Sequence, residues 1–224
     1  MVKPSLSARA LPEKEPGRRE RRKEETRRHI FQAAMKLFEK KGIFATTVEE
    51  ITEAADVGKG TFFNYFPSKE AIFSAMAERQ VGILDRAVKK ALVADSVRPV
   101  LLEMCKDLAS GPGRSQIMLR SLLGMVLNNK MLFAIFSAVL AKGRERVTTI
   151  LERGQQLGEV RGDLPADEMA RCLQHSVFGT SFIWAASKPS ELHEWQERSM
   201  NLFWRSIATH PEPAPPLLEA RKKK

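Results

Sequence analysis

The hydrophobic pattern of the chain is helical from about residue 26 almost to the C-terminus. In the first periodic segment, residues 26–41, the apolar positions recur at the 3.6-residue spacing of one helix face. These positions are Ile30, Ala33, Ala34, Leu37 and Phe38. Gly42 is expected to end this helix, because glycine readily adopts the left-handed conformation of a C-cap. No segment shows the period-two alternation of strands, so we predict an all-α fold.

Two short helices joined by a tight turn are predicted next. Thr47 and Glu50 have the spacing of a capping box, which places the start of the second helix at Thr47. Residues 56–58 form the connection, and a third helix runs from about 59 to 66, where Pro67 ends it. Three short helices with a three-residue turn between the second and third have the geometry of a helix-turn-helix.

The rest of the pattern predicts a larger helical unit of six helices. Ser68 is expected to cap a long helix that continues to about Val93. Two helices rich in large apolar residues are predicted at 166–187 and 191–209. The breaks between helices are expected at Asp95-Ser96, Gly111-Pro112-Gly113, Asn128-Asn129, residues 158–165 and Lys188-Pro189-Ser190.

The positive charge of the chain lies largely in its tails. The formal net charge is +10, which favours an acidic partner, nucleic acid before a membrane surface. Residues 1–28 hold ten Lys or Arg against five Glu, and the last four residues add four positive charges. Residues 1–23 and the Pro-rich residues 211–224 are predicted to be disordered. The basic arm is either a solvated tail or a segment that lies along DNA.

The sequence gives little support for a metal site, a catalytic site or a membrane-spanning segment. The four histidines are scattered, and Cys105 and Cys172 are expected to be buried, reduced thiols. No nucleophile lies near a base, so we predict no catalytic site, no metal and no cofactor. The most apolar stretch, residues 131–141, is far shorter than the roughly 20 residues of a membrane span. The N-terminal segment lacks the apolar run of a secretory signal. We therefore expect a cytoplasmic protein with no membrane contact.

The helix-turn-helix region carries a resemblance that is specific in combination. The runs Ile30-Phe31-Gln32-Ala33-Ala34, Thr46-Thr47-Val48-Glu49-Glu50-Ile51 and Lys59 to Glu70 resemble the first three helices and the start of the fourth in TetR-type repressors. The resemblance covers residues 24–84. It implies a DNA-binding domain there, with its motif at about 47–66, and a ligand-binding and dimerisation domain at 85–210. It also implies a homodimer that reads double-stranded DNA at a pseudo-palindromic operator, and a small-molecule effector.

The expected DNA contacts lie on the second and third helices and their flanks. A helix N-terminus offers free backbone N–H groups to phosphate, and the third helix keeps Phe62 and Phe66 in the core while its other side chains face base edges. The residues expected to contact DNA are Arg27, Arg28, Thr46, Thr47, Lys59, Gly60, Thr61, Phe63, Asn64, Tyr65 and Lys69.

Three positions depart from the pattern of the family. Asp56 stands where the turn usually has Gly, and Gly58 stands where the third helix usually has a capping Ser. Both changes are sterically tolerable. Phe63 stands in place of a phosphate-binding Tyr, so we expect it to contact DNA by packing, with Tyr65 supplying a hydroxyl nearby.

The larger unit is rich in methionine and aromatic residues, which suit a malleable pocket for a bulky hydrophobic ligand. Candidate ligand-binding residues are Met104, Met118, Met125, Phe133, Phe136 and Trp184. Candidate dimer-interface residues, on the last two helices, are Phe178, Phe182, Trp195, Leu202 and Phe203.

Taken together, the pattern predicts a homodimeric repressor that a small hydrophobic ligand releases from its operator. Three alternatives stay open: a non-specific DNA-binding protein that uses its basic tails, an activator, and a regulator that responds to no ligand. A helical enzyme is disfavoured because no catalytic set of residues is present.

Overall fold

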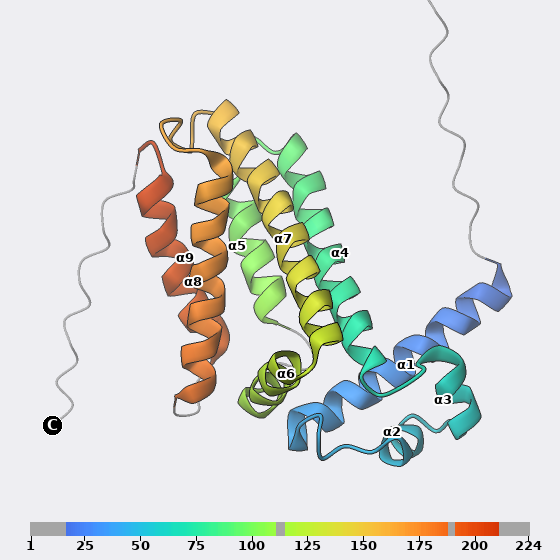
Figure 1. The fold of residues 1–224 in the computed structure, drawn as a ribbon. Coiled ribbons are helices and arrows are strands. Elements are labelled where there is room, and N and C mark those ends of the chain that lie inside the picture. The colour runs from blue at the N-terminus through green and yellow to red at the C-terminus, as the bar shows by residue number, and fades with distance from the viewer. Residues whose placement is uncertain (1–16, 111–114, 188–190, 211–224) are drawn as a thin grey trace, which may run out of the picture.

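Nine helices make up most of the residues that the structure, a computed structural model, describes, which are 17–110, 115–187 and 191–210 (Figure 1). The all-α class predicted from the sequence is confirmed. The helices are α1 (Arg18–Lys41), α2 (Val48–Ala54), α3 (Lys59–Tyr65), α4 (Ala71–Val93), α5 (Arg98–Ala109), α6 (Gln116–Asn128), α7 (Lys130–Gln156), α8 (Ala166–Ala186) and α9 (Leu192–Ile207).

Helix α1 begins earlier than the apolar pattern does. It starts at Arg18, so the prediction that residues up to 23 are disordered is wrong for 18–23. The Glu20 carboxylate accepts a hydrogen bond from the Gly17 backbone N–H at 2.9 Å, which caps the first turn. Arg, Lys and Glu are also good helix formers, and oppositely charged pairs at helical spacing add to this, which favours extension of α1 beyond its apolar positions. The rest of the predicted arm and the predicted tail, 211–224, lie outside the described residues.

Helices α1, α2 and α3 with the start of α4 form the unit that we call the head. Gly42 ends α1 with φ of +83°, a conformation that favours glycine, and a Cβ there would also crowd the Ser121 hydroxyl of α6. Asp56 has φ of +49°, the left-handed geometry expected of it in the turn between α2 and α3. Helix α4 starts at Ala71, after a single turn that follows Ser68, rather than directly at Ser68.

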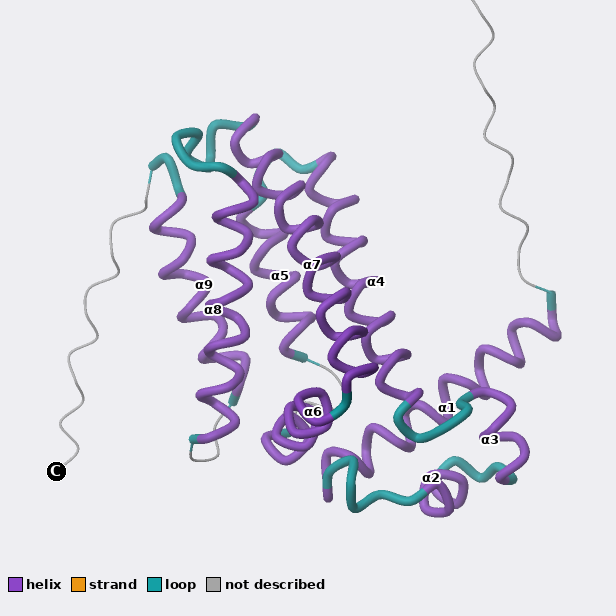
Figure 2. Tube along the Cα trace, viewed as in Figure 1, coloured by secondary structure: helices purple, strands orange, loops and turns teal. Residues whose placement is uncertain are grey.

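Two hydrophobic cores share the single long helix α4. The first core joins α1, α2, α3 and the start of α4, and the second joins the remainder of α4 to α5, α7, α8 and α9. The change from one core to the other falls between Ala75 and Ile83. Helix α6 contributes Met118, Met125 and Val126 to the first core, although the sequence placed it in the larger unit. Figure 2 shows α4 passing without a break from the head into the helical bundle.

The connection between α7 and α8 ties together three parts of the larger unit. The Arg161 backbone N–H donates to the Ile207 carbonyl oxygen at 2.8 Å, and the Thr209 N–H donates to the Glu159 carbonyl oxygen at 2.9 Å. The Glu159 carboxylate in turn accepts a hydrogen bond from the Val97 N–H, at the start of α5, at 2.7 Å. The ends of α7 and α9 and the start of α5 are therefore held in a fixed relation.

The two cysteines differ in their surroundings. Cys105 is buried in the second core, and burial raises the pKa of its thiol to about 12. Cys172 is exposed, contrary to the expectation of two buried thiols, because Met169 and Leu173 occupy the core-facing side of α8.

Among the described residues no single helix has the length and composition of a membrane span. Helices α6 and α7 meet these two criteria only when they are counted together, and the chain bends by 111° between them.

Packing at the end of α7 gives a testable prediction. A methyl group on Gly154 would approach Val160 Cγ2 to 2.6 Å and Val97 Cγ2 to 2.8 Å. We therefore expect Gly154→Ala to lower the free energy of unfolding by about 1–3 kcal/mol in a denaturant titration. The control is Gly143→Ala in the same helix, whose methyl would make an ordinary 3.5 Å contact with Leu84. That variant should be neutral or stabilised, because alanine favours helix. Equal stability of the two variants would contradict this packing.

Candidate functional site

Helix α3 presents one face to the core of the head and the other to solvent. Phe62 and Phe66 are buried with their ring centroids 5.9 Å apart, so they anchor the helix. Thr61 and Tyr65 are half-buried. The solvent-facing residues of α3 are Lys59, Gly60, Phe63, which is 50% exposed, and Asn64. This short, anchored helix can therefore enter a groove of DNA with small, polar and aromatic side chains foremost.

The start of α2 contains the predicted capping box. The Thr47 Oγ1 accepts a hydrogen bond from the Glu50 N–H at 3.2 Å, and the Glu50 carboxylate accepts one from the Thr47 N–H at 2.8 Å. Thr47 is exposed and can reach a phosphate. Thr46 is not available for that role, because it is completely buried and donates its hydroxyl proton to the Gly42 carbonyl oxygen at 2.8 Å. Thr46 therefore stabilises the loop after α1 by this hydrogen bond and does not make the contact with DNA that was expected of it.

Each acidic residue at the start of α2 is paired with a lysine. Lys59 donates a hydrogen bond to the Glu49 carboxylate at 2.6 Å, which lowers the pKa of Glu49. Lys41 donates to the Glu50 carboxylate, and this bond, followed by that from the Thr47 backbone, lowers the pKa of Glu50 to about 2. Lys59 must therefore leave or share Glu49 in order to neutralise a phosphate.

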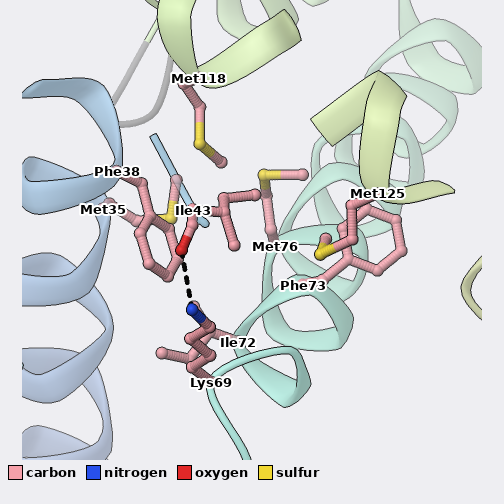
Figure 3. Close-up of a pocket in the computed structure, with 9 residues that line it drawn as sticks. All are labelled: Met35, Phe38, Ile43, Lys69, Ile72, Phe73, Met76, Met118 and Met125. Carbon is pink, nitrogen blue, oxygen red and sulfur yellow. Dashed lines mark hydrogen bonds between the residues drawn. The ribbon is translucent and has the colours of Figure 1, made fainter. Parts of the chain in front are cut away.

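Lys69 has a structural role in place of the expected phosphate contact. Its ammonium group is half-buried and donates to the carbonyl oxygens of Ile43 at 3.0 Å and Thr46 at 2.9 Å, with a weaker contact to that of Phe44 at 3.4 Å. These carbonyl groups lie in the loop between α1 and α2. Figure 3 shows the bond from Lys69 to Ile43. The lysine thus holds this loop against the start of α4.

Arg27 and Arg28 differ in their surroundings. The Arg27 guanidinium is paired with Glu78 of α4 at 2.9 Å and lies over the Phe66 ring, 5.6 Å from its centroid. It therefore joins α1, α3 and α4 and is not free for DNA. Arg28 is exposed and borders an open groove between the first turns of α1 and Tyr65 of α3. The other residues along this groove are Glu20, Arg21, Lys23, Glu24, Glu25 and Arg27.

Methionine side chains fill the junction between the head and α6 (Figure 3). The junction encloses a residual cavity of about 10 Å³, so it is almost fully packed. Its lining residues are Met35, Phe38, Ile43, Lys69, Ile72, Phe73, Met76, Met118 and Met125. Met118 and Met125 were expected to bind a ligand, but they face the head here because the packing of α6 turns them away from the bundle.

Helix α6 is also fastened to the end of α8. The Gln116 side chain donates to the Trp184 carbonyl oxygen at 2.7 Å, and the Arg120 guanidinium donates to the Ala185 carbonyl oxygen at 2.8 Å. Trp184, another expected ligand contact, is itself buried in a small cluster with Ala185 and Leu192. Helix α6 therefore connects the last two helices to the head.

A larger cavity, of about 120 Å³, lies inside the bundle. Its lining residues are Gln80, Leu84, Met104, Cys105, Leu108, Val139, Leu140, Gly143, Arg144, Val147, Leu173, Gln174, Val177, Phe178, Ser181 and Gln196. Of the six expected ligand-binding residues, only Met104 is among them. Phe133 is exposed on α7 instead, and Phe136 packs edge-on against Phe178 with ring centroids 5.8 Å apart.

The polar residues of this cavity were missed in the sequence. A signal for one of them existed, because Gln196 interrupts an apolar stripe of α9 that Leu192, Met200 and Phe203 form at helical spacing. Gln174 likewise lies beside buried Leu173 on α8. A polar residue on the buried side of an amphipathic helix is costly unless it has a partner, so such positions mark either a hydrogen-bond network or a binding site.

Large apolar side chains are exposed on α8 and α9. Phe182 of α8 is 59% exposed and Leu202 of α9 is 68% exposed. The 2.9 Å hydrogen bond between the hydroxyls of Thr180 and Ser199 places these two helices side by side at this level. The surface that these side chains form consists of Phe178, Phe182, Ile183 and Leu202.

Two residues predicted for the dimer interface lie elsewhere. Phe203 is buried in the second core and cannot reach a partner, because the opposite side of α9 carries Leu202. Trp195 is half-buried and packs against the cluster around Trp184. Within the described residues, no group of three His, Cys, Asp or Glu side chains could hold a metal ion.

Known regulators resemble this chain in sequence and in structure. The family model for bacterial regulatory proteins of the tetR family matches residues 30–76. The transcriptional repressor DhaR of Mycobacterium sp. (strain GP1) is 28% identical over 159 residues, which is 64% of this chain and 74% of DhaR. Thermus thermophilus FadR, a TetR-family repressor solved with lauroyl-CoA, is 30% identical, with a TM-score of 0.56 over 84% of this chain and 98% of FadR.

A further solved structure shares the fold. SmeT, the repressor of a multidrug efflux pump of Stenotrophomonas maltophilia, was solved with triclosan and has a TM-score of 0.67 over 85% of this chain and 99% of SmeT. At 21% identity this likeness concerns the architecture alone. The likeness to FadR and DhaR extends well beyond the head, whereas the family model covers only the head.

The different roles of Lys69 and Lys59 give a testable prediction. Lys69→Met removes a charged donor from the carbonyl groups of the loop, so we expect the free energy of unfolding to fall by about 1.5–3 kcal/mol. Lys59→Met removes only an exposed ion pair and should change it by less than about 0.5 kcal/mol. Thermal and denaturant unfolding of both variants measure the difference. A Lys69→Met protein as stable as Lys59→Met would show that Lys69 does not hold the loop.

Proposed function

This chain belongs to the TetR family of bacterial transcriptional regulators, and we propose that it is a homodimeric repressor that a small, mainly apolar ligand releases from its operator. Membership of this family establishes that the protein is a DNA-binding regulator of transcription and not an enzyme. The observation that carries the proposal is α3, a short helix anchored by Phe62 and Phe66 with Lys59, Phe63 and Asn64 on its open face.

DNA reading is assigned to residues 24–84. Asn64 is suited to a bidentate contact with adenine, and Gly60 lets the backbone of α3 approach the phosphates closely. Lys59, Thr47 and Arg28 contact phosphates, with Phe63 and Tyr65 packing beside them. The exposed basic turns of α1, which continue the groove beside Tyr65, extend this contact along the phosphate backbone.

Dimerisation and effector binding are assigned to residues 85–210. The exposed surface of Phe178, Phe182, Ile183 and Leu202 on α8 and α9 supports dimerisation, since an apolar surface of this kind is covered in most stable proteins. A two-fold dimer then presents two copies of α3 to half-sites about 34–36 Å apart along one face of the duplex. The operator is accordingly pseudo-palindromic.

The effector site is assigned to the cavity of the bundle. Gln80 and Leu84 of α4 line this cavity, and the same helix carries the head on its other end. A ligand that displaces α4, or α6 at its methionine junction, changes the distance between the two α3 helices. FadR and SmeT were solved with lauroyl-CoA and triclosan, so molecules with large apolar parts bind to proteins of this architecture.

DNA binding tests the assignment of α3. We expect Lys59→Ala/Asn64→Ala to weaken binding to an operator selected from randomised duplexes, by about 1–3 kcal/mol for the base contact, and to reduce the salt slope by about 1 for the lost phosphate contact. Glu49→Gln should have the opposite effect and tighten binding to DNA, because it removes the carboxylate that pairs with Lys59 and frees the lysine for a phosphate. Titrations at two salt concentrations, against the operator and a scrambled duplex, measure all three proteins.

The same titrations separate the proposal from its rival. A non-specific binder that uses the basic turns of α1 and its other basic segments would bind both duplexes equally and ignore the substitutions in α3. That outcome would contradict specific regulation through the helix-turn-helix. A much larger loss of binding to the operator than to the scrambled duplex would support it, because only the Asn64 contact depends on sequence, whereas the Lys59 contact to phosphate is lost on both.

The α8–α9 surface gives a prediction about assembly. We expect the wild-type protein to have twice the chain mass of 25.2 kDa in light scattering, and Phe182→Glu to shift it to the single-chain mass. A charge buried without a partner in an apolar interface is strongly unfavourable. Phe133→Glu is the control, because Phe133 is comparably exposed but lies on α7. A dimer that survives Phe182→Glu would place the interface elsewhere.

A further inference from the structure

One hydrogen-bond acceptor in the wall of the cavity has no donor among the residues that the structure describes. Gln196 of α9 lines the cavity and is only 5% exposed. Among the described residues nothing donates a hydrogen bond to its Oε1. A buried amide oxygen without a donor is unfavourable, and buried polar atoms are generally satisfied by protein, water or a ligand. The position of this oxygen beside a cavity therefore points to a group that binds there.

Neighbouring bonds fix which end of the Gln196 amide is free. The Ser181 hydroxyl donates its single proton to the Val177 carbonyl oxygen at 2.8 Å. It can therefore only accept from Gln196, whose Nε2 lies 3.1 Å away. The Nε2 group is directed to Ser181, and Oε1 is left as an acceptor. A complementary ligand must supply an O–H or N–H donor.

The charged residues around the cavity limit the charge that a ligand can carry. Arg144 is the one charged residue among the described residues that line it. The Cys105 thiol stays neutral, because burial raises its pKa to about 12. Glu103 and Glu197 line a neighbouring groove between α5 and α9, which shares Cys105 and Gln196 with the cavity, but neither carboxylate lines the cavity itself. A cation inside the cavity would meet a like charge and no carboxylate.

We propose that the effector is an apolar molecule, uncharged or anionic, with a hydroxyl or N–H group that donates to Gln196 Oε1. The apolar body lies against residues such as Leu84, Met104 and Val147. This inference rests on the proposed function for its regulatory consequence, but the binding it describes does not require DNA. According to this proposal the cavity binds apolar ligands that carry a hydrogen-bond donor, and it does not bind apolar cations.

The test uses matched probes in which a methyl group replaces the hydrogen of the donor. 2-Naphthol and 2-methoxynaphthalene form one pair, and indole and 1-methylindole form the other. We expect the full-length wild-type protein, without DNA, to bind the donor member of each pair about tenfold more tightly in calorimetry, the effect of one hydrogen bond to a buried acceptor. Gln196→Met removes the acceptor at similar volume and should abolish the preference. A naphthyl trimethylammonium probe should not compete with 2-naphthol.

A matched variant controls for loss of any amide from the cavity. Gln174 also lines the cavity, but its Nε2 already donates to the Leu140 carbonyl oxygen at 2.8 Å, so Gln174→Met should keep the preference for the donor. Equal binding within both pairs, no binding of any probe, or a preference that survives Gln196→Met would overturn the inference. The comparison within the wild-type chain holds even where a variant fails to fold.

Operator release is measured separately, so that the two proposals can fail independently. A donor preference that depends on Gln196 but leaves operator affinity unchanged supports the ligand class and contradicts ligand-driven release. Release of the operator by compounds that lack a donor contradicts the ligand class and leaves the repressor proposal intact.

Discussion

The arrangement of this protein depends on α4 remaining a single unbroken helix. Its first turns are buried in the core of the head, and its residues from Ile83 onward are buried in the core of the bundle. A continuous helix transmits rotation and translation along its length, because its backbone hydrogen bonds resist bending except at specific defects. The head therefore has no independent orientation. Its position is set by where the bundle holds the other end of α4, with α6 as a second support.

The two supports of the head respond to different parts of the bundle. Gln80 and Leu84 connect α4 to the cavity, whereas Gln116 and Arg120 connect α6 to the carbonyl groups at the end of α8. In the proposed dimer, α8 belongs to the interface, so α6 carries the position of the partner to the head while α4 carries the occupancy of the cavity. Coupling between a cavity and a DNA-reading helix then needs no contact between them, only a shared element with two arrangements.

Local signals in the sequence predicted the head well and the bundle poorly. The capping box at Thr47 and the left-handed turn at Asp56 depend on neighbouring residues, so spacing alone reveals them. The role of Lys69 depends on carbonyl groups more than twenty residues away in the chain, which no periodicity shows. Met118 and Met104 are both apolar positions of predicted helices, yet one faces the head and the other lines the cavity. The packing of whole helices decides between such positions.

The methionine junction has a consequence for the energetics of switching. Its residual cavity is only about 10 Å³, so the head and α6 meet almost without void. Methionine side chains are unbranched and adapt by rotation about several bonds. A shift of the head can therefore exchange one dense packing for another without opening empty space, and the molecular volumes of the two arrangements remain nearly equal. Hydrostatic pressure, which favours whichever state has less void, then has little influence on the position of the head.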